Sequence, residues 1–234
     1  PRRTNGSDSQ FTRRPLAEVA HSGLAPTAGQ IHVRVVNLVN VKRPFFRSQV
    51  RALERVGIEC DTVTVPGTYE PETGTSRSIL DYLRFYPRVL RAVDADVDIV
   101  HANYGLTAPA ALAQPRRPVV LSLWGSDVLG RYGWLSRVCA RHVDAVIVMS
   151  PALESELDCN CHVLPHGVDT TLFEPPSRRA AREALDWDHD AYHVLFPYTP
   201  NRAVKNYPRA RRVVERVGER LNRPVVLETV SGVA

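Results

Sequence analysis

Short runs of β-branched residues alternate along this chain with segments of helical spacing, and this alternation limits the folds open to it. From Ile31 onward the runs are I-H-V-R-V-V-N-L, C-D-T-V-T-V, V-D-I-V-H-A, P-V-V-L-S-L-W and A-V-I-V-M-S. Repeated strand–helix–strand units are typical of a parallel sheet. The sequence therefore predicts an α/β fold, a Rossmann-like parallel sheet with flanking helices.

The segments between these runs supply the crossover helices. The first has apolar residues at helical spacing before a helix-ending glycine, Gly57, and further helices are expected at about 76–93 and within 130–142. A short helix is expected after Ser150, with Pro151 at its first position and Glu154 placed for a capping box.

The chain divides into four parts. Residues 1–30 are rich in Ser, Thr, Gly, Pro and Arg and lack a sustained apolar period, so we expect a disordered or loosely ordered arm. Residues 31–165 are expected to form the first domain, 166–190 an interdomain crossing, and 191–234 the start of a second, truncated strand–helix–strand domain. Two strands and one helix cannot bury both faces of a sheet, so this second domain is expected to be incomplete.

Composition limits the class of protein. The 234 residues are 44% apolar, yet no run approaches the roughly 18 apolar residues of a membrane span. Charges stand where a signal peptide would be apolar, and four scattered cysteines cannot form a disulfide framework, so we expect the cytoplasm. The net charge of +5 suits an anionic partner. Nucleic acid is not expected, because no basic stripe is interleaved with aromatic residues.

Four segments hold residues suited to a binding site. They are D-I-V-H-A-N-Y-G from Asp98, L-W-G-S-D-V from Leu123, V-L-P-H-G-V-D-T-T-L-F-E-P from Val163, and R-A-V-K from Arg202. Ligands bind open α/β sheets outside the carboxyl ends of the strands, where the loops of the first two segments begin. The third segment marks the end of the first domain, so a cleft is expected to begin there.

In their order and spacing, these segments resemble the retaining glycosyltransferases of the GT-B fold, of the family 4 or group 1 type, across residues 31–234. The resemblance implies an acceptor-side domain followed by the start of a donor-binding domain. It implies transfer of a sugar from a UDP- or GDP-sugar to a saccharide, lipid or other alcohol acceptor with retention, without a metal or a cofactor. The family's Glu-rich donor motif has no counterpart, so this chain is expected to be inactive alone.

Arg202 and Lys205 are the candidates for the donor phosphates. A departing nucleoside diphosphate develops charge that a metal-free site must stabilise with fixed cations. The two lie three residues apart where a loop meets a helix, whose N-terminus adds positive potential. In the family, a matching Arg and Lys bind the diphosphate. A pair of solvated surface charges is the alternative.

The L-W-G-S-D-V segment supplies candidates for the acceptor side. Many relatives have a histidine before its glycine, where this chain has Trp124, which cannot shuttle a proton. The resemblance therefore implies a stacking or wall role for Trp124, with Gly125 and Ser126 shaping the cleft and Asp127 as a catalytic candidate. Turn residues beside a core tryptophan are the alternative.

His101, at the end of its strand, is the second catalytic candidate, and Asn103 stands where the family often has another histidine. A satisfied, half-buried histidine is the alternative for His101. At the crossing, the resemblance implies that His166 and Gly167 line the cleft, with Gly167 allowing a tight backbone reversal. A plain turn is the alternative there.

Two basic segments are candidates for peripheral contact with an anionic membrane, at its inner face. The glycine-free loop after the first strand contains Lys42, Arg43, Phe45, Phe46 and Arg47. The following helix contains Arg77, Arg84, Arg88 and Arg91 beside Ile79, Leu80, Leu83 and Tyr86. For that helix, a solvated basic face opposite a core-facing stripe is the alternative.

Other chemistries lack local support. The C-x-C-H segment at Cys159 has no partner pair at zinc-finger spacing, so no metal site is expected. A dinucleotide fingerprint, a P-loop and a nucleophile elbow are all missing, which disfavours dehydrogenases, kinases and hydrolases. The alternative to a transferase is a non-catalytic Rossmann-like module that binds an acceptor, a membrane surface or another phosphate ligand, or half of a split enzyme.

Overall fold

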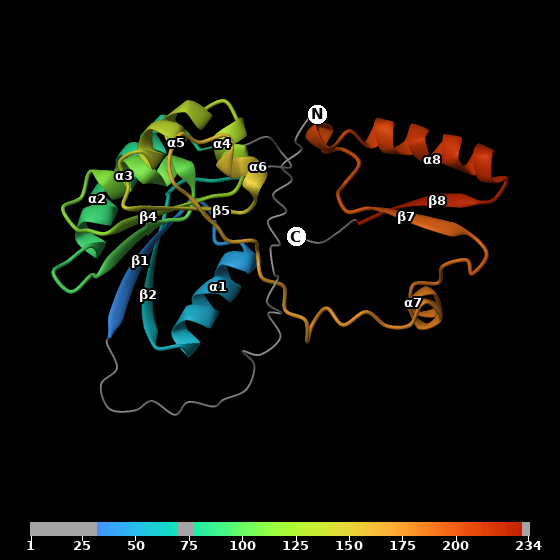
Figure 1. Ribbon diagram of the computed structural model, residues 1–234, viewed down its shortest axis with the longest axis horizontal. Helices are drawn as coiled ribbons and strands as arrows, with labels where there is room; N and C mark the ends of the chain where they lie inside the picture. Colours follow the sequence, from blue (N-terminus) through green and yellow to red (C-terminus); the bar gives the residue numbers. More distant parts are fainter. Residues whose placement is uncertain (1–31, 70–76, 231–234) are drawn as a thin grey trace, which may run out of the picture.

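The structure, a computed structural model, describes residues 32–69 and 77–230 and contains two parallel sheets (Figure 1). The arm expected over residues 1–30 lies outside the described residues. The larger sheet has six strands in the order β2-β1-β3-β4-β5-β6, and every pairing in it is parallel. This confirms the predicted α/β fold with a Rossmann-like sheet. Its strands are β1 (Val33–Val39), β2 (Ile58–Thr64), β3 (Ile99–Ala102), β4 (Val119–Leu123), β5 (Ala145–Val148) and β6 (His162–Val163).

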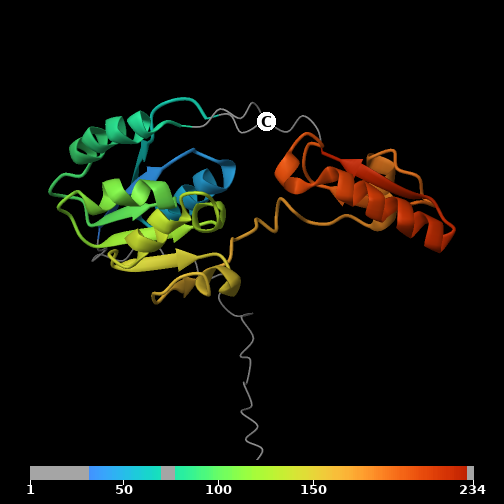
Figure 2. The ribbon, with the colours of Figure 1, turned by 90° about the horizontal axis from the view of Figure 1, so that it is seen from above.

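Helices cover the two faces of this sheet unequally. The connection from β1 to β2 runs toward one edge of the sheet, and the connections from β2 onward run toward the other edge. Because crossovers between parallel strands are right-handed, helices in connections of opposite direction lie on opposite faces. Accordingly, within the described ranges, α1 is the one helix on one face, and α2, α3 and α5 form a layer on the other (Figures 1 and 2). The elements are α1 (Pro44–Arg55), α2 (Ile79–Ala92), η1 (Gly105–Thr107), α3 (Ala108–Leu112), α4 (Ser126–Leu129), α5 (Gly133–Ala140) and α6 (Pro151–Glu154).

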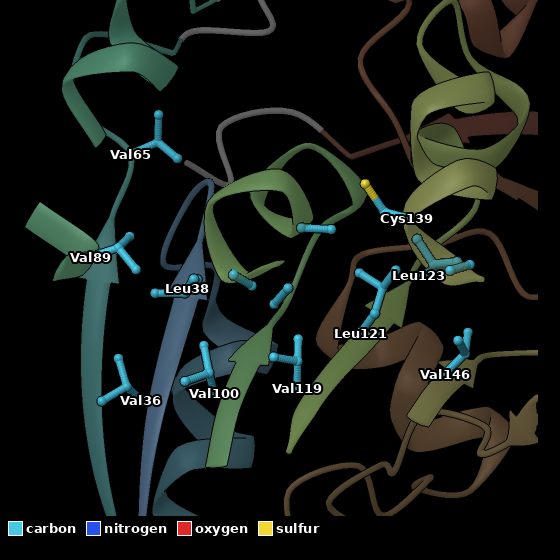
Figure 3. Packing of buried hydrophobic residues seen from close by; sticks show 14 of the residues in the cluster. Val36, Leu38, Val65, Val89, Val100, Val119, Leu121, Leu123, Cys139 and Val146 are labelled. Carbon is cyan, nitrogen blue, oxygen red and sulfur yellow. The ribbon is translucent and has the colours of Figure 1, made fainter. Parts of the chain in front are cut away.

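The main hydrophobic core lies between the sheet and the layer of α2, α3 and α5 (Figure 3). Leu38, Val100 and Leu121 come from neighbouring strands, and Val89 and Cys139 meet them from α2 and α5. All five side chains are buried. Truncation of one such leucine to alanine costs about 2–5 kcal/mol, so this core fixes the strand order on which the site depends.

The N-terminal caps of α2 and α6 show how these two helices begin, and the cap of α6 corrects one prediction. Ser78 and Asp81 form the capping box of α2, in which the Asp81 carboxylate accepts from the Ser78 N–H at 2.8 Å. At α6, Ser150 accepts from the Leu153 N–H, so the N-cap was predicted correctly. The expected capping box with Glu154 was wrong, because the third helical position is Leu153, which has no oxygen to reach back.

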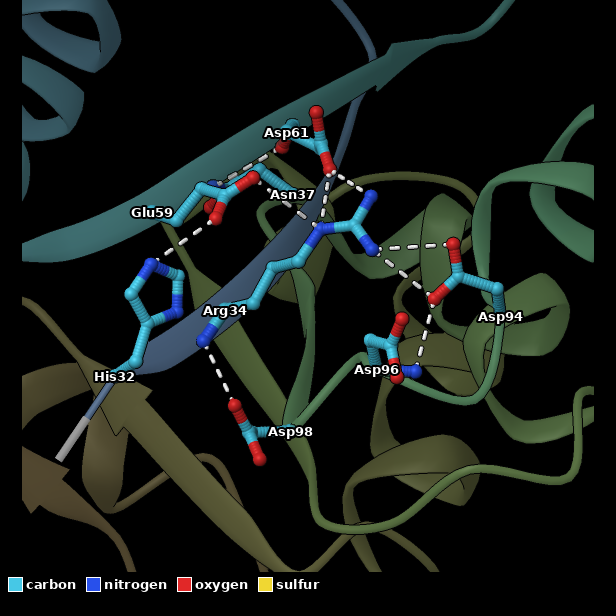
Figure 4. Close-up of polar contacts among 8 residues, drawn as sticks. All are labelled: His32, Arg34, Asn37, Glu59, Asp61, Asp94, Asp96 and Asp98. Atoms are coloured by element: carbon cyan, nitrogen blue, oxygen red, sulfur yellow. Dashed lines mark hydrogen bonds and ion pairs between the residues drawn. The ribbon is translucent and has the colours of Figure 1, made fainter.

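An arginine network fixes the amino-terminal edge of the larger sheet (Figure 4). The Arg34 guanidinium contacts Asp61 of β2 at 2.7 Å and Asp94, before β3, at 3.0 Å. The Asp96 N–H and this guanidinium hold the pKa of Asp94 below its ordinary value. The Arg34 N–H also donates to Asp98 at 2.8 Å. The network joins β1, β2 and the segment that leads into β3. It lies at the amino-terminal ends of these strands, opposite the carboxyl ends where ligands bind.

The smaller sheet pairs β7 (Tyr192–Phe196) with β8 (Val225–Thr229) in parallel, and α8 (Tyr207–Leu221) connects them. The helix α7 (Arg178–Ala184) precedes β7, and the short η2 (Ala203–Lys205) precedes α8. Val214 of α8 is buried, whereas Val194 and Leu195 of β7 remain exposed. Among the helices of the described residues, none has the length and apolar character needed to cross a bilayer.

Candidate functional site

A pocket of about 230 Å³ opens at the carboxyl ends of β1, β3 and β4. Asn40 follows β1, Asn103 and Tyr104 follow β3, and Trp124 and Ser126 follow β4 along its wall. The strand order reverses between β1 and β3, because β2 lies on the far side of β1. Such a reversal leaves a crevice between diverging loops, the usual ligand position in open α/β sheets.

Four of the residues that the sequence proposed for substrate or donor binding line this pocket. Asn103, Trp124 and Ser126 come from the strand-end loops of the larger sheet, and Arg202 comes from the segment after β7. Acceptor-side and donor-side candidates thus meet in one place. Among the described residues, the pocket lining does not include His101, Gly125, Asp127, His166, Gly167 or Lys205, although Gly125 and Asp127 belong to the same loop as Trp124.

Asp127 joins the two loops that shape the pocket wall. One carboxylate oxygen accepts from the Trp124 and Gly125 N–H groups at 2.9 and 2.8 Å. The other accepts from the Gly105 N–H at 3.1 Å. Burial raises the pKa of Asp127, while these N–H groups act in the opposite direction. Gly125 has a φ of +117°, a conformation that favours glycine, so the turn that presents its N–H requires this residue.

Asn103 is buried at the pocket wall, and its amide is only partly satisfied. Its Nδ2 donates to Asn37 Oδ1 at 3.0 Å, and its backbone carbonyl accepts from the Trp124 indole N–H at 2.8 Å. Its Oδ1 has no hydrogen-bond partner among the described residues. A buried acceptor left unpaired is costly, so a donor group on a ligand would stabilise this atom.

His101 lies inside the sheet, beneath the pocket. Its Nε2 is 2.8 Å from Ser122 Oγ on β4, and its carbonyl oxygen accepts from Asn103 Nδ2 at 3.4 Å. Burial lowers the pKa of His101 to about 4, so the imidazole is neutral near pH 7. The imidazole is therefore neutral and hydrogen-bonded to Ser122. From this position beneath the pocket, His101 helps to hold Asn103 in the pocket wall.

An aromatic cluster attaches the crossing to the pocket. The His166 ring stacks on Trp124 with centroids 4.6 Å apart, and Phe45 contacts both rings at 4.8 and 4.9 Å. Of the two aromatic residues in the loop after β1, Phe46 is buried, whereas Phe45 packs against Trp124 and His166 and remains 42% exposed. The tight reversal expected at Gly167 is absent, since its φ is not positive and an added Cβ would meet nothing within 4 Å.

Arg202 and Lys205 share one aromatic support. The Lys205 ammonium nitrogen lies 4.1 Å from the centroid of the Tyr198 ring, and the Arg202 guanidinium carbon lies 5.4 Å from it. Both side chains are exposed, and Asn206, in a left-handed conformation, caps the following helix α8 by accepting from the Arg209 N–H. The two cations therefore project from one short segment at the N-terminus of a long helix, where an anion is stabilised.

A second cationic group lies at the pocket, where the sequence had named Arg43 and Arg77 only as candidates for membrane contact and had not named Tyr69. Arg43 and Tyr69 line the pocket, and the Arg43 and Arg77 guanidinium carbons lie 5.8 and 5.6 Å from the centroid of the Tyr69 ring. Arg77 also donates to Asn40 Oδ1 at 3.0 Å. Tyr69 follows the carboxyl end of β2, so its position at a strand end was the signal that could have found it.

No group of three metal-binding side chains occurs within the described ranges. Cys159 and Cys161, whose sulfur atoms are 3.8 Å apart, form a pair without a third ligand. Burial raises the pKa of the Cys161 thiol to about 12, as does the bond to Cys159, which disfavours the thiolate that a metal needs.

The chain was compared with known protein families and with curated proteins. Residues 31–172, which include the larger sheet and the start of the crossing, match the model of the family described as Glycosyltransferase Family 4. No curated protein matches the chain.

Proposed function

The chain belongs to glycosyltransferase family 4, and we propose that it takes part in moving a sugar from a UDP- or GDP-sugar to an alcohol acceptor, with retention. One observation carries this proposal. The pocket at the reversal of strand order combines neutral hydrogen-bonding groups of the larger sheet with Arg202 from beyond the crossing. Hydroxyl-rich acceptors need the first kind of group, and a diphosphate needs the second.

The donor side of the proposal rests on Arg202 and Lys205. Because both lie over the Tyr198 ring, their charges remain close together without an anionic side chain to neutralise them among the described residues. A diphosphate that bridges them would gain charge-assisted hydrogen bonds. As the sugar bond breaks, the same cations would stabilise the negative charge that develops on the leaving diphosphate. No metal is needed in this scheme.

The acceptor side rests on Asn103, Ser126 and Trp124. The unpaired Asn103 Oδ1 is suited to accept from a sugar or alcohol hydroxyl, and the Trp124 ring forms the adjoining wall. For Asp127 and His101 we propose positioning roles in place of direct chemistry. The Asp127 carboxylate is occupied by backbone N–H groups, and the His101 ring by Ser122.

The alternative function is that of a binding module or half of a split enzyme. Val194 and Leu195 of β7 and Val226 of β8 are exposed, so the two-stranded sheet leaves apolar surface that further structure would cover. We therefore propose that this chain binds substrates but needs a more complete second domain to turn them over.

Binding and transfer can be tested separately. Saturation-transfer NMR with UDP and GDP detects weak binding, and we expect one of them to bind the 234-residue chain. The double variant R202Q/K205Q should weaken that binding by at least about tenfold, since the loss of even one charged hydrogen bond costs about 1.5–3 kcal/mol. R212Q/R216Q, which removes the same charge from an exposed part of α8, should leave it unchanged.

Release of labelled sugar from nucleotide-sugar donors then distinguishes the two functions. Transfer to an added alcohol, with the anomeric configuration retained by NMR, identifies an enzyme. Binding without transfer identifies the module. If neither UDP nor GDP binds, or if R202Q/K205Q and its control behave alike, the donor assignment is wrong.

A further inference from the structure

Helix α2 has apolar side chains on its outer side as well as on its inner side. Phe85 and Val89 are fully buried against the sheet. On the opposite side, Ile79, Leu80 and Leu83 are 76%, 59% and 63% exposed, and Leu90 continues the stripe. A surface helix normally turns polar residues to solvent. This outer stripe is therefore a contact surface that the described part of the chain does not use.

Arginines follow this stripe along one flank. Arg84, Arg88 and Arg91 are spaced so that they project together and beside the leucines. None of them takes part in an ion pair among the described residues. The acid of the first turn, Asp81, is occupied by the N-cap Ser78. The flank thus carries positive charge that no ion pair within the described ranges neutralises.

A second exposed apolar group lies on the same side of the sheet. The helix α3 packs between α2 and α5, so α2 and α5 belong to one layer (Figure 1). On α5, Trp134 is 61% exposed and Val138 is also exposed; Leu129 and Tyr132 precede them. The Arg131 guanidinium carbon lies 5.6 Å from the centroid of the Tyr132 ring.

We propose that the outer side of the α2–α3–α5 layer binds the surface of an anionic lipid bilayer. Leucine and isoleucine insert below the headgroups, tryptophan and tyrosine favour the boundary between lipid and water, and arginines pair with lipid phosphates. The layer supplies this combination as a whole: α2 provides the leucines, the isoleucine and the arginines, and α5 with the segment before it provides Trp134, Tyr132 and Arg131. Of the two segments named from the sequence for membrane contact, this surface includes the helix α2 and leaves out the loop after β1, where Phe46 is buried and Phe45 packs against Trp124.

The proposal concerns membrane binding and does not depend on sugar transfer. Its geometry nevertheless relates to the pocket, because α2 begins beside it. Arg77 and Tyr82 both donate to Asn40, which lines the pocket, at 3.0 and 3.2 Å. A bilayer in contact with α2 would therefore lie near the pocket mouth.

Sedimentation with lipid vesicles tests this surface directly. The chain should bind vesicles of phosphatidylcholine with phosphatidylglycerol more tightly than vesicles of phosphatidylcholine alone. R84Q/R88Q/R91Q should reduce the partition coefficient by about a hundredfold, from about 1 kcal/mol for each arginine near the surface. L80Q/L83Q should reduce binding to both kinds of vesicle, because it removes inserted apolar groups.

The matched control is R209Q/R212Q/R216Q on α8, which removes the same charge from exposed positions of another helix. Every variant retains the arginines of residues 1–30, so differences between variants report on the helices alone. W134Q on α5 is a second, independent variant and should also weaken binding.

Three outcomes would overturn the proposal. The first is an α8 control that loses as much binding as the α2 variant, which would indicate attraction by net charge. The second is equal binding by wild type, L80Q/L83Q and W134Q. The third is a dimer in lipid-free sedimentation equilibrium that L80Q/L83Q dissociates, because the stripe would then bind a second copy. Thermal melts by circular dichroism establish that each variant is folded, as expected for changes at exposed positions.

Discussion

The Lys205 ammonium nitrogen lies 4.1 Å from the centroid of the Tyr198 ring, and the Arg202 guanidinium lies over the same ring. Cations over an aromatic face are attracted by its quadrupole, which limits the orientations of two long, exposed side chains. Tyr198 itself packs edge-on against Phe196, whose side chain is buried. The ring therefore connects the proposed phosphate-binding cations to the rigid part of the smaller sheet.

Tyr198→Leu should weaken nucleotide binding while both cations remain. A cation–π contact at an exposed site is worth about 0.5–1 kcal/mol, so the loss for two such contacts is about fivefold to thirtyfold in affinity. Titration of UDP or GDP, followed by NMR, measures it. Tyr198→Phe keeps the ring and should bind as the wild type does. If the phenylalanine variant loses as much as the leucine variant, the hydroxyl group and not the ring positions the cations.

Gly125 and Gly167, both named from the sequence as cleft residues, should respond in opposite ways to alanine. Gly125 has a φ of +117°, so Gly125→Ala should lower the free energy of unfolding by about 1–3 kcal/mol. Gly167→Ala meets no atom within 4 Å and has no such conformation, so stability should change by less than about 1 kcal/mol. Urea unfolding measures both. Equal losses would show that Gly167 occupies a strained turn after all.

The larger sheet was predictable because each of its strands can be recognised from its local sequence. Runs such as A-V-I-V-M-S are short, β-branched and separated by helical spacing, and a parallel sheet follows from that alternation. Three pocket residues were predictable for a related reason: the carboxyl ends of parallel strands meet at one edge, so Asn103, Trp124 and Ser126 had to lie near one another. Arg202 was added by the family resemblance.

The remaining features depend on side-chain geometry that no local pattern encodes. The rings of Phe45 and Phe46 could have faced either way, and packing against Trp124 decided the direction for Phe45. Arg43 and Tyr69 belong to different loops that approach each other only after β1 and β2 have paired. The outer apolar stripe of α2 is visible in the sequence, but only burial distinguishes its outer leucines from those of a core.

Asp127→Asn should destabilise the protein even though it removes a buried charge. Asparagine has one acceptor oxygen where Asp127 uses two, so its NH₂ group would face either the Gly105 N–H or the pair from Trp124 and Gly125. A buried donor without an acceptor costs about 1–3 kcal/mol, and we expect a loss of this size in the free energy of unfolding at pH 7. Thermal and urea unfolding measure it.

The control for Asp127 is Glu215→Gln, which removes an exposed carboxylate from an Arg211 pair on α8. Such a pair contributes about 0.2–0.5 kcal/mol, so this change should be nearly silent. If Asp127→Asn is equally silent, the carboxylate does not hold the two loops together, and its assignment as a positioning residue fails.

The buried His101 should make stability depend on pH between about 4 and 6.5. Burial lowers its pKa from 6.5 to about 4, so in this window the unfolded chain binds a proton that the folded protein excludes. The free energy of unfolding therefore falls on acidification, by about 3 kcal/mol across the window. His101→Gln, whose amide can still bond Ser122, should remove this part of the slope in urea midpoints measured from pH 4.5 to 7.5. Parallel curves for the two proteins would mean that the folded protein accepts the proton as readily as the unfolded chain.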